Sequence, residues 1–269
     1  MPSASTNTRL SSHSRNPYKS MAATAAAPAK ADYGIDAPSV LKSMLTRGGV
    51  FLAFGLLIWY MNRLLTPGRA LAMLLVLGAI GLVYLLIAAA MLWSSRVGKL
   101  GVRDRLLDSI ALRGDEKVLD VGCGRGLLLI GAAKRLTSGR VTGVDIWSAD
   151  DLSSNSADAV RSNARAEGVA DRIRIEDADA RKLPFANESF DAVVSSTAIH
   201  NIEDRDERGQ AIGEMVRVLK PGGRLALFDI LHTADYAREL RALGLTDVSL
   251  SPLSFPWCMP ARSVTARKP

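Results

Sequence analysis

The sequence predicts an α/β domain with a doubly wound, mostly parallel sheet, preceded by two membrane-spanning helices. From about residue 98 onward, short apolar segments alternate with amphipathic helical segments, as in strand–helix–strand units. A glycine-rich turn follows the first of these apolar segments, and two long apolar runs lie upstream. We therefore expect a disordered basic tail over 1–47, a transmembrane hairpin over 48–95 and the α/β domain over 96–269.

Residues 1–31 have the composition of a tail, because they contain no acidic residue and are rich in Ser, Thr and Ala. Disorder is the first interpretation. An organellar transit peptide is the alternative, and Met21 could be the true start. Four basic residues lie in this segment: Arg9, Arg15, Lys19 and Lys30.

The formal net charge of +7 would suit nucleic acid or anionic lipid as a partner. No basic run with interleaved aromatic residues is present, so we expect no nucleic acid. Cys123 and Cys258 are the two cysteines, and they lie far apart without the spacing of metal ligands. We therefore expect neither a disulfide framework nor a metal.

The apolar runs cover residues 48–61 and 70–93, and the second is unbroken by any charge. About 20 apolar residues span a bilayer as a helix, so the second run is long enough and the first is marginal. Trp59, Tyr60 and Trp93 lie near the run ends, where interfacial aromatic residues belong. A buried helical hairpin in a soluble fold is the alternative.

The basic residues that flank the hairpin predict its orientation. Both outer ends carry more Lys and Arg than the connecting loop, so both ends, and the α/β domain, should lie on the cytoplasmic side or its organellar equivalent. The outer residues are Lys42, Arg47, Arg96, Lys99, Arg103 and Arg105, and those of the loop are Arg63 and Arg69.

Within the α/β domain the pattern predicts alternating strands and helices. The expected strands are 118–121, 140–145, 173–175, 190–195, 225–229, 246–250 and 263–266, and the expected helices are 102–112, 127–136, 157–167, 208–219 and 234–243.

The glycine turn indicates a ligand cradle after the first strand. Its sequence is Val118-Leu119-Asp120-Val121-Gly122-Cys123-Gly124-Arg125-Gly126. Bare backbone allows close approach of a ligand, and we expect free N–H groups to point into the gap. The spacing is G-x-G-x-G rather than the G-x-G-x-x-G of dinucleotide sites, and Asp120 would repel a pyrophosphate but suit a cationic amino group. A nicotinamide-dependent reductase is therefore disfavoured.

Polar residues follow the other predicted strands, where open α/β sheets bind ligands. Asp145 ends the second strand, roughly twenty residues after the turn, which is the expected place for an acid that binds ribose hydroxyls. Asp179 follows the third strand, the segment 195–200 follows the fourth, and Asp229 and His232 follow the fifth.

These motifs, in this order, resemble the class I S-adenosylmethionine (SAM) methyltransferases of the methyltransferase type 11 group. The landmarks beyond the turn are Asp179-Ala180, Leu183-Pro184-Phe185, Ser189-Phe190-Asp191 and Leu219-Lys220-Pro221-Gly222-Gly223. The resemblance covers roughly 98–269 and implies a Rossmann-like fold and SAM as cofactor.

The resemblance also implies roles for single residues. Gly122, Gly124 and the Asp120 region would hold the methionine moiety, Asp145 the ribose and Ile146 the adenine ring. Asp179 would accept a bond from the adenine amino group, with the Ala180 backbone beside it. Apart from the resemblance, Ser195, Ser196 and Thr197 at the end of the fourth strand could touch the cofactor carboxylate or the substrate, although a strand end rich in Ser and Thr is common without either role.

The connection after Asp145 is longer than is usual in that family. Trp147, within it, could cover the adenine or line the substrate mouth, or pack against the sheet edge. Little chain is left between the fifth strand and the last strands for a substrate cap, so the hairpin could supply part of the site.

Methyl transfer to a phenol, hydroxyl or ring carbon is helped by a base, and His200 is the best candidate, with His232 and Asp204 weaker. A structural role for the His200 imidazole is the alternative. The expected function is a membrane-anchored SAM-dependent methyltransferase that acts on an O, C or N atom of a small, lipophilic acceptor. The alternative is a non-catalytic membrane scaffold or sensor with the same fold.

Overall fold

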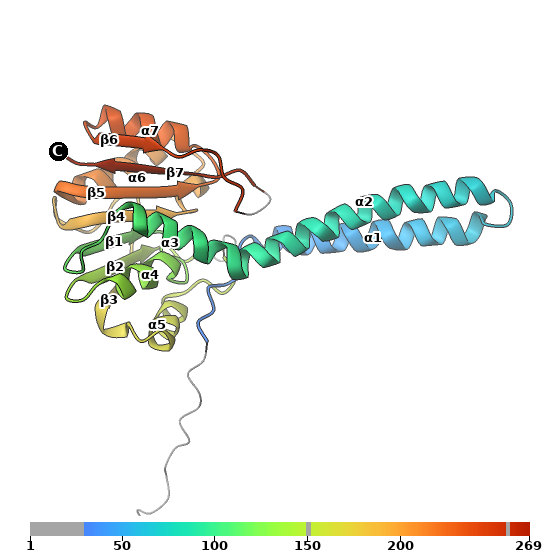
Figure 1. Ribbon diagram of the computed structural model, residues 1–269, viewed down its shortest axis with the longest axis horizontal. Coiled ribbons are helices and arrows are strands. Elements are labelled where there is room, and N and C mark those ends of the chain that lie inside the picture. Colours follow the sequence, from blue (N-terminus) through green and yellow to red (C-terminus); the bar gives the residue numbers. More distant parts are fainter. Residues whose placement is uncertain (1–29, 149–151, 257–258) are drawn as a thin grey trace, which may run out of the picture.

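A computed structural model describes residues 30–148, 152–256 and 259–269. Figure 1 shows an α/β domain from which a long helical hairpin projects. Cys258 lies outside the described residues, as does most of the expected tail.

The domain is built on a seven-stranded sheet with the order β3-β2-β1-β4-β5-β7-β6. The five strands from β3 to β5 run parallel, and β7 is antiparallel to both of its neighbours. This confirms the predicted doubly wound, mostly parallel sheet. The strands are β1 (Lys117–Val121), β2 (Arg140–Asp145), β3 (Ile173–Asp177), β4 (Phe190–Ser196), β5 (Leu219–Asp229), β6 (Thr246–Leu250) and β7 (Arg262–Arg267).

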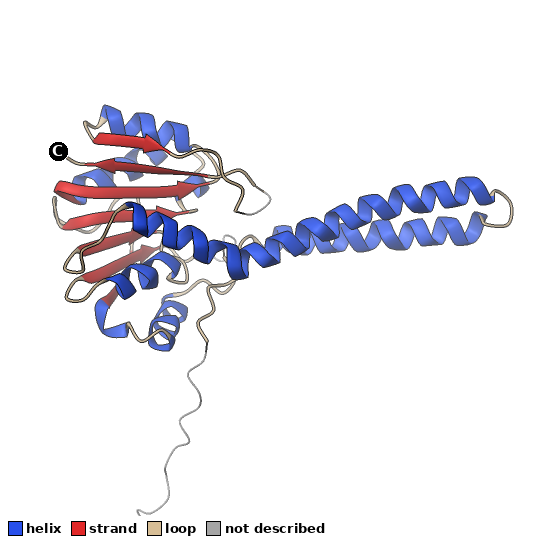
Figure 2. Ribbon diagram, viewed as in Figure 1, coloured by secondary structure: helices blue, strands red, loops and turns tan. Residues whose placement is uncertain are grey.

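Helices cover both faces of the sheet (Figure 2). Neighbouring residues of β1 show the period-2 pattern that makes this possible, because Val118 packs on one face and Leu119 on the other. On the Val118 face lie α3 (Lys99–Ser109), α4 (Leu127–Arg135) and α5 (Ala157–Ala166), and on the Leu119 face lie α6 (Arg205–Val218) and α7 (Thr233–Ala242). Short 3-10 turns are η2 (Ala170–Arg172) and η3 (Ile199–Asn201).

Strand β5 begins earlier than its sequence predicts. The pattern predicts a helix to residue 219 and a strand only from residue 225, but the strand starts at Leu219. Leu219 pairs with Phe190 and Arg224 pairs with Ala192, so a bulge in β5 accommodates the proline and the two glycines between them.

The hairpin consists of α1 (Pro38–Asn62) and α2 (Pro67–Trp93). The α2 helix continues through a π-helical turn, η1 (Ser94–Gly98), directly into α3 of the domain. Helix α1 starts at Pro38, whereas the apolar pattern placed the hairpin from residue 48, because the polar residues before Gly48 extend the same helix. Both helices are long and apolar enough to cross a membrane.

Small residues let the two hairpin helices approach closely. Gly48 and Gly55 of α1 and Gly81 of α2 are buried between them. A Cβ atom on Gly81 would lie 2.9 Å from the Gly48 carbonyl oxygen. This packing of small residues is typical of helix pairs in membranes.

Candidate functional site

The glycine loop after β1 has the expected turn but not the expected free donors. Gly122, Gly124 and Gly126 all have positive φ angles, which glycine adopts without strain. The Gly122 and Cys123 N–H groups both donate to the Val144 carbonyl, at 2.9 and 3.0 Å. The Gly126 N–H group donates to the Cys123 carbonyl. The expectation that these N–H groups point into a gap is therefore wrong, because the loop is bonded to β2 and to itself.

Gly122 has a packing role that joins two parts of the site. A Cβ atom at this position would lie 2.2 Å from the Ala198 Cβ atom. Ala198 belongs to the segment between β4 and η3 that also carries His200. The absent side chain thus lets the β4 loop sit against the glycine loop.

Asp120 is buried beneath the loop rather than exposed to a ligand, with 1% of its surface accessible. Its Oδ2 atom accepts a hydrogen bond of 2.8 Å from the Leu129 N–H group near the N-terminus of α4. The cap residue of that helix is Gly126, which has no side chain, so Asp120 takes over the capping. The expected direct exposure of this carboxylate to a cationic amino group is therefore corrected. Its Oδ1 atom is buried and has no hydrogen-bond partner among the described residues.

Burial raises the pKa of Asp120 to about 8, and this makes folding stability depend on pH. Between pH 5 and about 8 the folded protein holds a proton that the unfolded chain has released, so stability falls as pH rises. We expect the wild type to lose about 1.4 kcal/mol per pH unit relative to Asp120→Asn, and the difference to level off above about pH 8. Unfolding of both proteins across this range measures it, and parallel curves would contradict it.

Asp145 lies at the carboxyl end of β2 and faces the glycine loop. Its Oδ2 atom accepts a hydrogen bond of 2.7 Å from the Gly124 N–H group, and its Oδ1 atom accepts one of 2.6 Å from the Trp147 N–H group. The Asn155 amide lies 3.3 Å from Oδ1. The neighbouring Ile146 is 68% exposed at the strand end. A carboxylate that accepts hydrogen bonds, a glycine without a side chain and an exposed apolar side chain therefore lie together at the carboxyl end of β2.

Asp179 and Ala180 follow β3, one strand further along the sheet. The Asp179 carboxylate is held by Arg181, whose guanidinium and N–H group both donate to it. The Arg181 side-chain bonds hold the pKa of Asp179 below its usual value. Ala180 is half-buried against the core.

Ser195 serves the sheet and not an open site. Its hydroxyl donates a hydrogen bond of 2.7 Å to the Val121 carbonyl, and the residue is 2% exposed. The expectation that it touches the cofactor carboxylate or the substrate is therefore wrong for this arrangement, since its hydroxyl joins β4 to β1.

His200 forms a pair with a buried acid at the end of the next strand. The His200 Nδ1 atom lies 2.6 Å from the Asp229 Oδ1 atom. Asp229 is 2% exposed, and its Oδ2 atom accepts bonds of 3.2 Å from the His200 N–H group and the Tyr236 hydroxyl. Burial, and next the Asp229 charge, raise the pKa of Tyr236 far above its usual value, so its phenol remains a donor. A proton on Nδ1 would face this carboxylate and would leave Nε2 as a proton acceptor.

The weaker candidates have structural positions. Asp204 caps α6 by accepting bonds from the Asp206 and Glu207 N–H groups, at 2.8 and 2.9 Å. His232 precedes α7. Trp147 packs on the core, and its Nε1 atom donates to Asp177 at 2.6 Å, which matches the sheet-edge alternative.

Sequence reasoning placed Asp229 at a strand end but gave it no role. The signal was available, because β4 and β5 are consecutive parallel strands, and parallel strands bring residues at their carboxyl ends together. Three residues that bind residues 32–36 were missed, since their partners are mainly backbone atoms distant in sequence: Arg125, Asn163 and Lys99.

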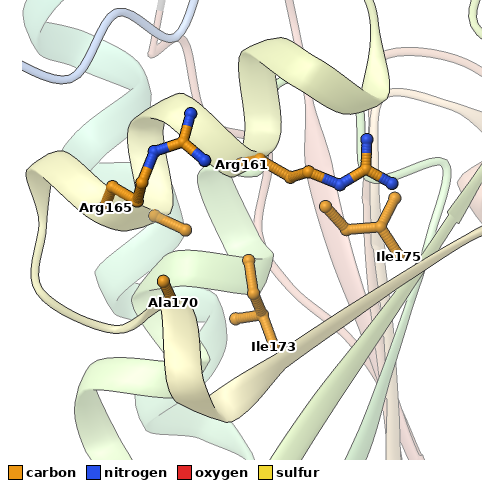
Figure 3. Close-up of a pocket in the computed structure, with 6 residues that line it drawn as sticks. Arg161, Arg165, Ala170, Ile173 and Ile175 are labelled. Atoms are coloured by element: carbon orange, nitrogen blue, oxygen red, sulfur yellow. The ribbon is translucent and has the colours of Figure 1, made fainter.

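A shallow cavity lies elsewhere, between α5 and the edge strand β3 (Figure 3). Apolar side chains and two arginines, Arg161 and Arg165, line it, and none of the expected cofactor residues does. It is therefore not the site that the strand ends form. Among the described residues, no group of three or more His, Cys, Asp and Glu side chains could hold a metal ion.

The chain is similar to known methyltransferases in sequence. The family described as "Methyltransferase domain" matches residues 118–223. The chain is 38% identical over 128 residues to the methyltransferase GfsG of Streptomyces halstedii, which covers 48% of this chain and 42% of the relative. It is 38% identical to the 27-O-demethylrifamycin SV methyltransferase of Amycolatopsis mediterranei, over 48% of this chain and 43% of the relative. The chain thus spans less than half the length of these relatives.

The fold is similar to that of solved methyltransferases. Phosphoethanolamine N-methyltransferase 2 of Haemonchus contortus, solved with SAM, superposes with a TM-score of 0.52 at 17% identity. The match covers 63% of this chain and 52% of that one. Residues 118–223 thus match the methyltransferase domain family, and the sheet around them has the fold of a solved methyltransferase.

Proposed function

We propose that this protein is a membrane-anchored methyltransferase that transfers a methyl group from SAM to a small, lipophilic acceptor. The observation that carries the proposal is the meeting of Asp145 with Gly124 at the carboxyl end of β2, inside the segment that matches the methyltransferase family. The proposal covers an O, C or N atom of the acceptor as the atom that receives the methyl group.

The residues at this site fit SAM. Asp145 offers a carboxylate to ribose hydroxyls, and Ile146 offers an exposed apolar surface to adenine. The Oδ1 atom of Asp120 is buried beneath this site, and a water between it and the amino-acid end of the cofactor would give it a partner. Asp179 and the Ala180 backbone follow on the adjacent strand. When bound, SAM supplies the electrophilic methyl group.

We assign His200 as the general base that receives the acceptor's proton. Asp229 orients the imidazole through Nδ1, and Tyr236 and the Ile230 N–H group hold the Asp229 carboxylate in turn. The Nε2 atom then takes the proton as the acceptor atom attacks, and Asp229 stabilises the resulting imidazolium.

The membrane part of the proposal is supported by the exposed surface of the hairpin. Large apolar side chains cover its outside, and contiguous apolar surface of this size is unfavourable in water. Examples are Leu75 at 64%, Val76 at 58% and Leu82 at 53% exposed. Helix α1 has 25 residues and is about 37 Å long, sufficient for a hydrocarbon core of about 30 Å. By the basic-residue bias, the domain lies on the cytoplasmic or equivalent side.

A lipophilic acceptor is supported by the orientation of the sheet. The carboxyl ends of the parallel strands point towards the side from which the hairpin projects (Figure 2). Apolar side chains are exposed in the loops on this side, namely Leu231, Leu253, Phe255 and Met259. The Pro256 carbonyl lies close to Gly98 in η1, which places the second of these loops at the foot of the hairpin. An acceptor dissolved in the bilayer would thus be near the site.

Charges on the outside of α2 provide a test of membrane insertion. We expect Leu75→Asp combined with Leu82→Asp to prevent integration, because each acid costs about 3 kcal/mol at the centre of a membrane helix. The wild type should resist carbonate extraction and float with vesicles, and the variant should not. The matched control is the Ala pair at the same positions, since both side chains point away from α1. Extraction of the wild type by carbonate would contradict the proposal.

Two measurements test the catalytic part. Titration of the detergent-purified chain with S-adenosylhomocysteine (SAH), and separately with NADH, tests the cofactor: binding of NADH alone would overturn the proposal. Incubation with labelled SAM and a membrane lipid extract tests the acceptor. Label in the lipid fraction supports a lipophilic acceptor, label only in water-soluble compounds contradicts it, and SAH binding without any transfer favours the scaffold.

A further inference from the structure

Residues 32–36, which we call the strap, lie between the glycine loop and the foot of the hairpin. Figure 1 shows the segment before α1 rising alongside α5 to the point where the hairpin leaves the domain. The sequence placed these residues in a disordered tail. Their backbone is instead bonded at one end to the loop Gly124-Arg125-Gly126 and at the other to the helix that continues α2.

Arg125, the residue between two glycines of the loop, holds the strap at its first end. Its Nε atom donates to the Asp32 carbonyl at 2.7 Å, and its Nη2 atom donates to the Asp32 carboxylate at 3.0 Å. Its Nη1 atom donates to the Ser153 and Ser154 carbonyls, at 3.1 and 3.2 Å. The side chain is 11% exposed. One guanidinium therefore joins the glycine loop, the strap and the β2–α5 loop.

Asn163 of α5 also bonds both the strap and the glycine loop. It is 4% exposed, and its Oδ1 atom accepts the Asp32 N–H group at 2.9 Å. Its Nδ2 atom donates to the carbonyls of Asp32 and Arg125, at 2.8 and 3.0 Å. The backbone of the loop and that of the strap are thus held by one buried amide.

Gly34 shows how closely the strap lies on the loop. It is buried with φ at +74°, and a Cβ atom there would lie 2.8 Å from the Arg125 Cδ atom and 3.0 Å from Leu152. Only glycine allows both the backbone conformation and this approach.

Lys99 and Ser95 hold the strap at its second end. The Lys99 amine, 8% exposed, donates to the Tyr33 and Gly34 carbonyls at 2.8 Å each and to the Asp36 carboxylate at 3.2 Å. All three of its donors are therefore used inside the protein. Ser95 donates to the same carboxylate and accepts the Asp36 N–H group. Both residues lie on the helix that continues from the hairpin.

We propose that the strap positions the glycine loop for SAM binding, with Arg125 and Lys99 as positioning residues that link the hairpin to the cofactor site. The inference rests on the proposed cofactor function. A loop of left-handed glycines is costly to order, and contacts that order it before binding raise affinity. Gly124 lies next to Arg125, and the Gly124 N–H group donates to Asp145. Contacts that order Arg125 therefore also order the residues at the ligand site.

The affinity of the full chain for SAH tests the strap. We expect Arg125→Ala and Lys99→Met each to weaken SAH binding about tenfold, a usual size for coupling between sites. Because both act through one strap, the double variant should bind about as weakly as either single variant, rather than about a hundredfold more weakly. Hydrogen exchange of the loop peptide in ligand-free protein should become faster in each variant.

Arg135→Ala is the matched control. Its guanidinium also bonds a carbonyl, that of Gly131, and two acids, Asp104 and Asp108, but has no bond to the strap. We expect it to bind SAH like the wild type while losing comparable thermal stability. Wild-type affinity in Arg125→Ala and Lys99→Met, or additive losses in the double variant, would overturn the inference. Failure of the wild type itself to bind SAH would overturn the proposed cofactor function and the inference with it.

Discussion

Asp145→Ala is expected to weaken the binding of SAH by more than about 100-fold. If the carboxylate accepts two ribose hydroxyls, each charge-assisted hydrogen bond contributes about 1.5–3 kcal/mol, which sums to at least about 3 kcal/mol. The substitution also removes the acceptor that holds the Gly124 N–H group. Both effects act at the ligand site, and no residue of the sheet core is changed.

Isothermal titration of the full chain in detergent measures this loss. Asp191→Ala is the matched control, because Asp191 is the second residue of β4, at the opposite end of the parallel strands from the site, and pairs with Lys220. It should bind SAH like the wild type. An Asp145→Ala variant that unfolds at a normal temperature and binds SAH with unchanged affinity would remove Asp145 from the cofactor site.

Much of this site could be predicted because it depends on strand ends. Parallel strands bring their carboxyl ends to one edge, so Asp145, Asp179 and His200 were expected to lie at that edge once the strands had been found. The strand boundaries followed from short apolar runs beside glycine turns. The family resemblance suggested the roles of these residues, whereas the topology of a parallel sheet alone predicted where they lie.

The errors have physical causes that a linear pattern does not contain. Ser195 was proposed for its position, but its hydroxyl is used by the Val121 carbonyl of a neighbouring strand. The glycine loop was expected to present free donors, but β2 already accepts two of them. The strap was assigned to a tail because its bonds are made by backbone atoms, and backbone atoms leave no signature in residue types.

For two charged residues that are buried in the fold, the charge of the side chain also led to wrong expectations. Asp120 seemed suited to face a cation, yet it is enclosed beneath α4, where burial raises its pKa to about 8. Lys99 was counted among the basic residues that set the orientation of the hairpin, yet its charge is enclosed by the strap. Such residues reveal their partners only when the fold is known.

The His200–Asp229 pair is expected to control the rate of methyl transfer without affecting SAH binding. A general base contributes about 10²–10⁴ in rate, so His200→Gln should lower turnover by at least about 100-fold. Asp229→Asn should lower it too, because an amide that donates towards Nδ1 would favour the wrong tautomer. The assay is transfer from labelled SAM, at saturation, to the acceptor fraction of a lipid extract.

A second histidine on the same side of the sheet provides the control for this rate loss. His232→Gln is the matched variant, since His232 follows β5 and its Nδ1 atom lies 3.9 Å from Asp235, and it should keep the wild-type rate. Retention of wild-type turnover by His200→Gln, with SAH still bound, would reduce the imidazole to a support for the β4 loop and leave positioning of the acceptor as the main source of catalysis.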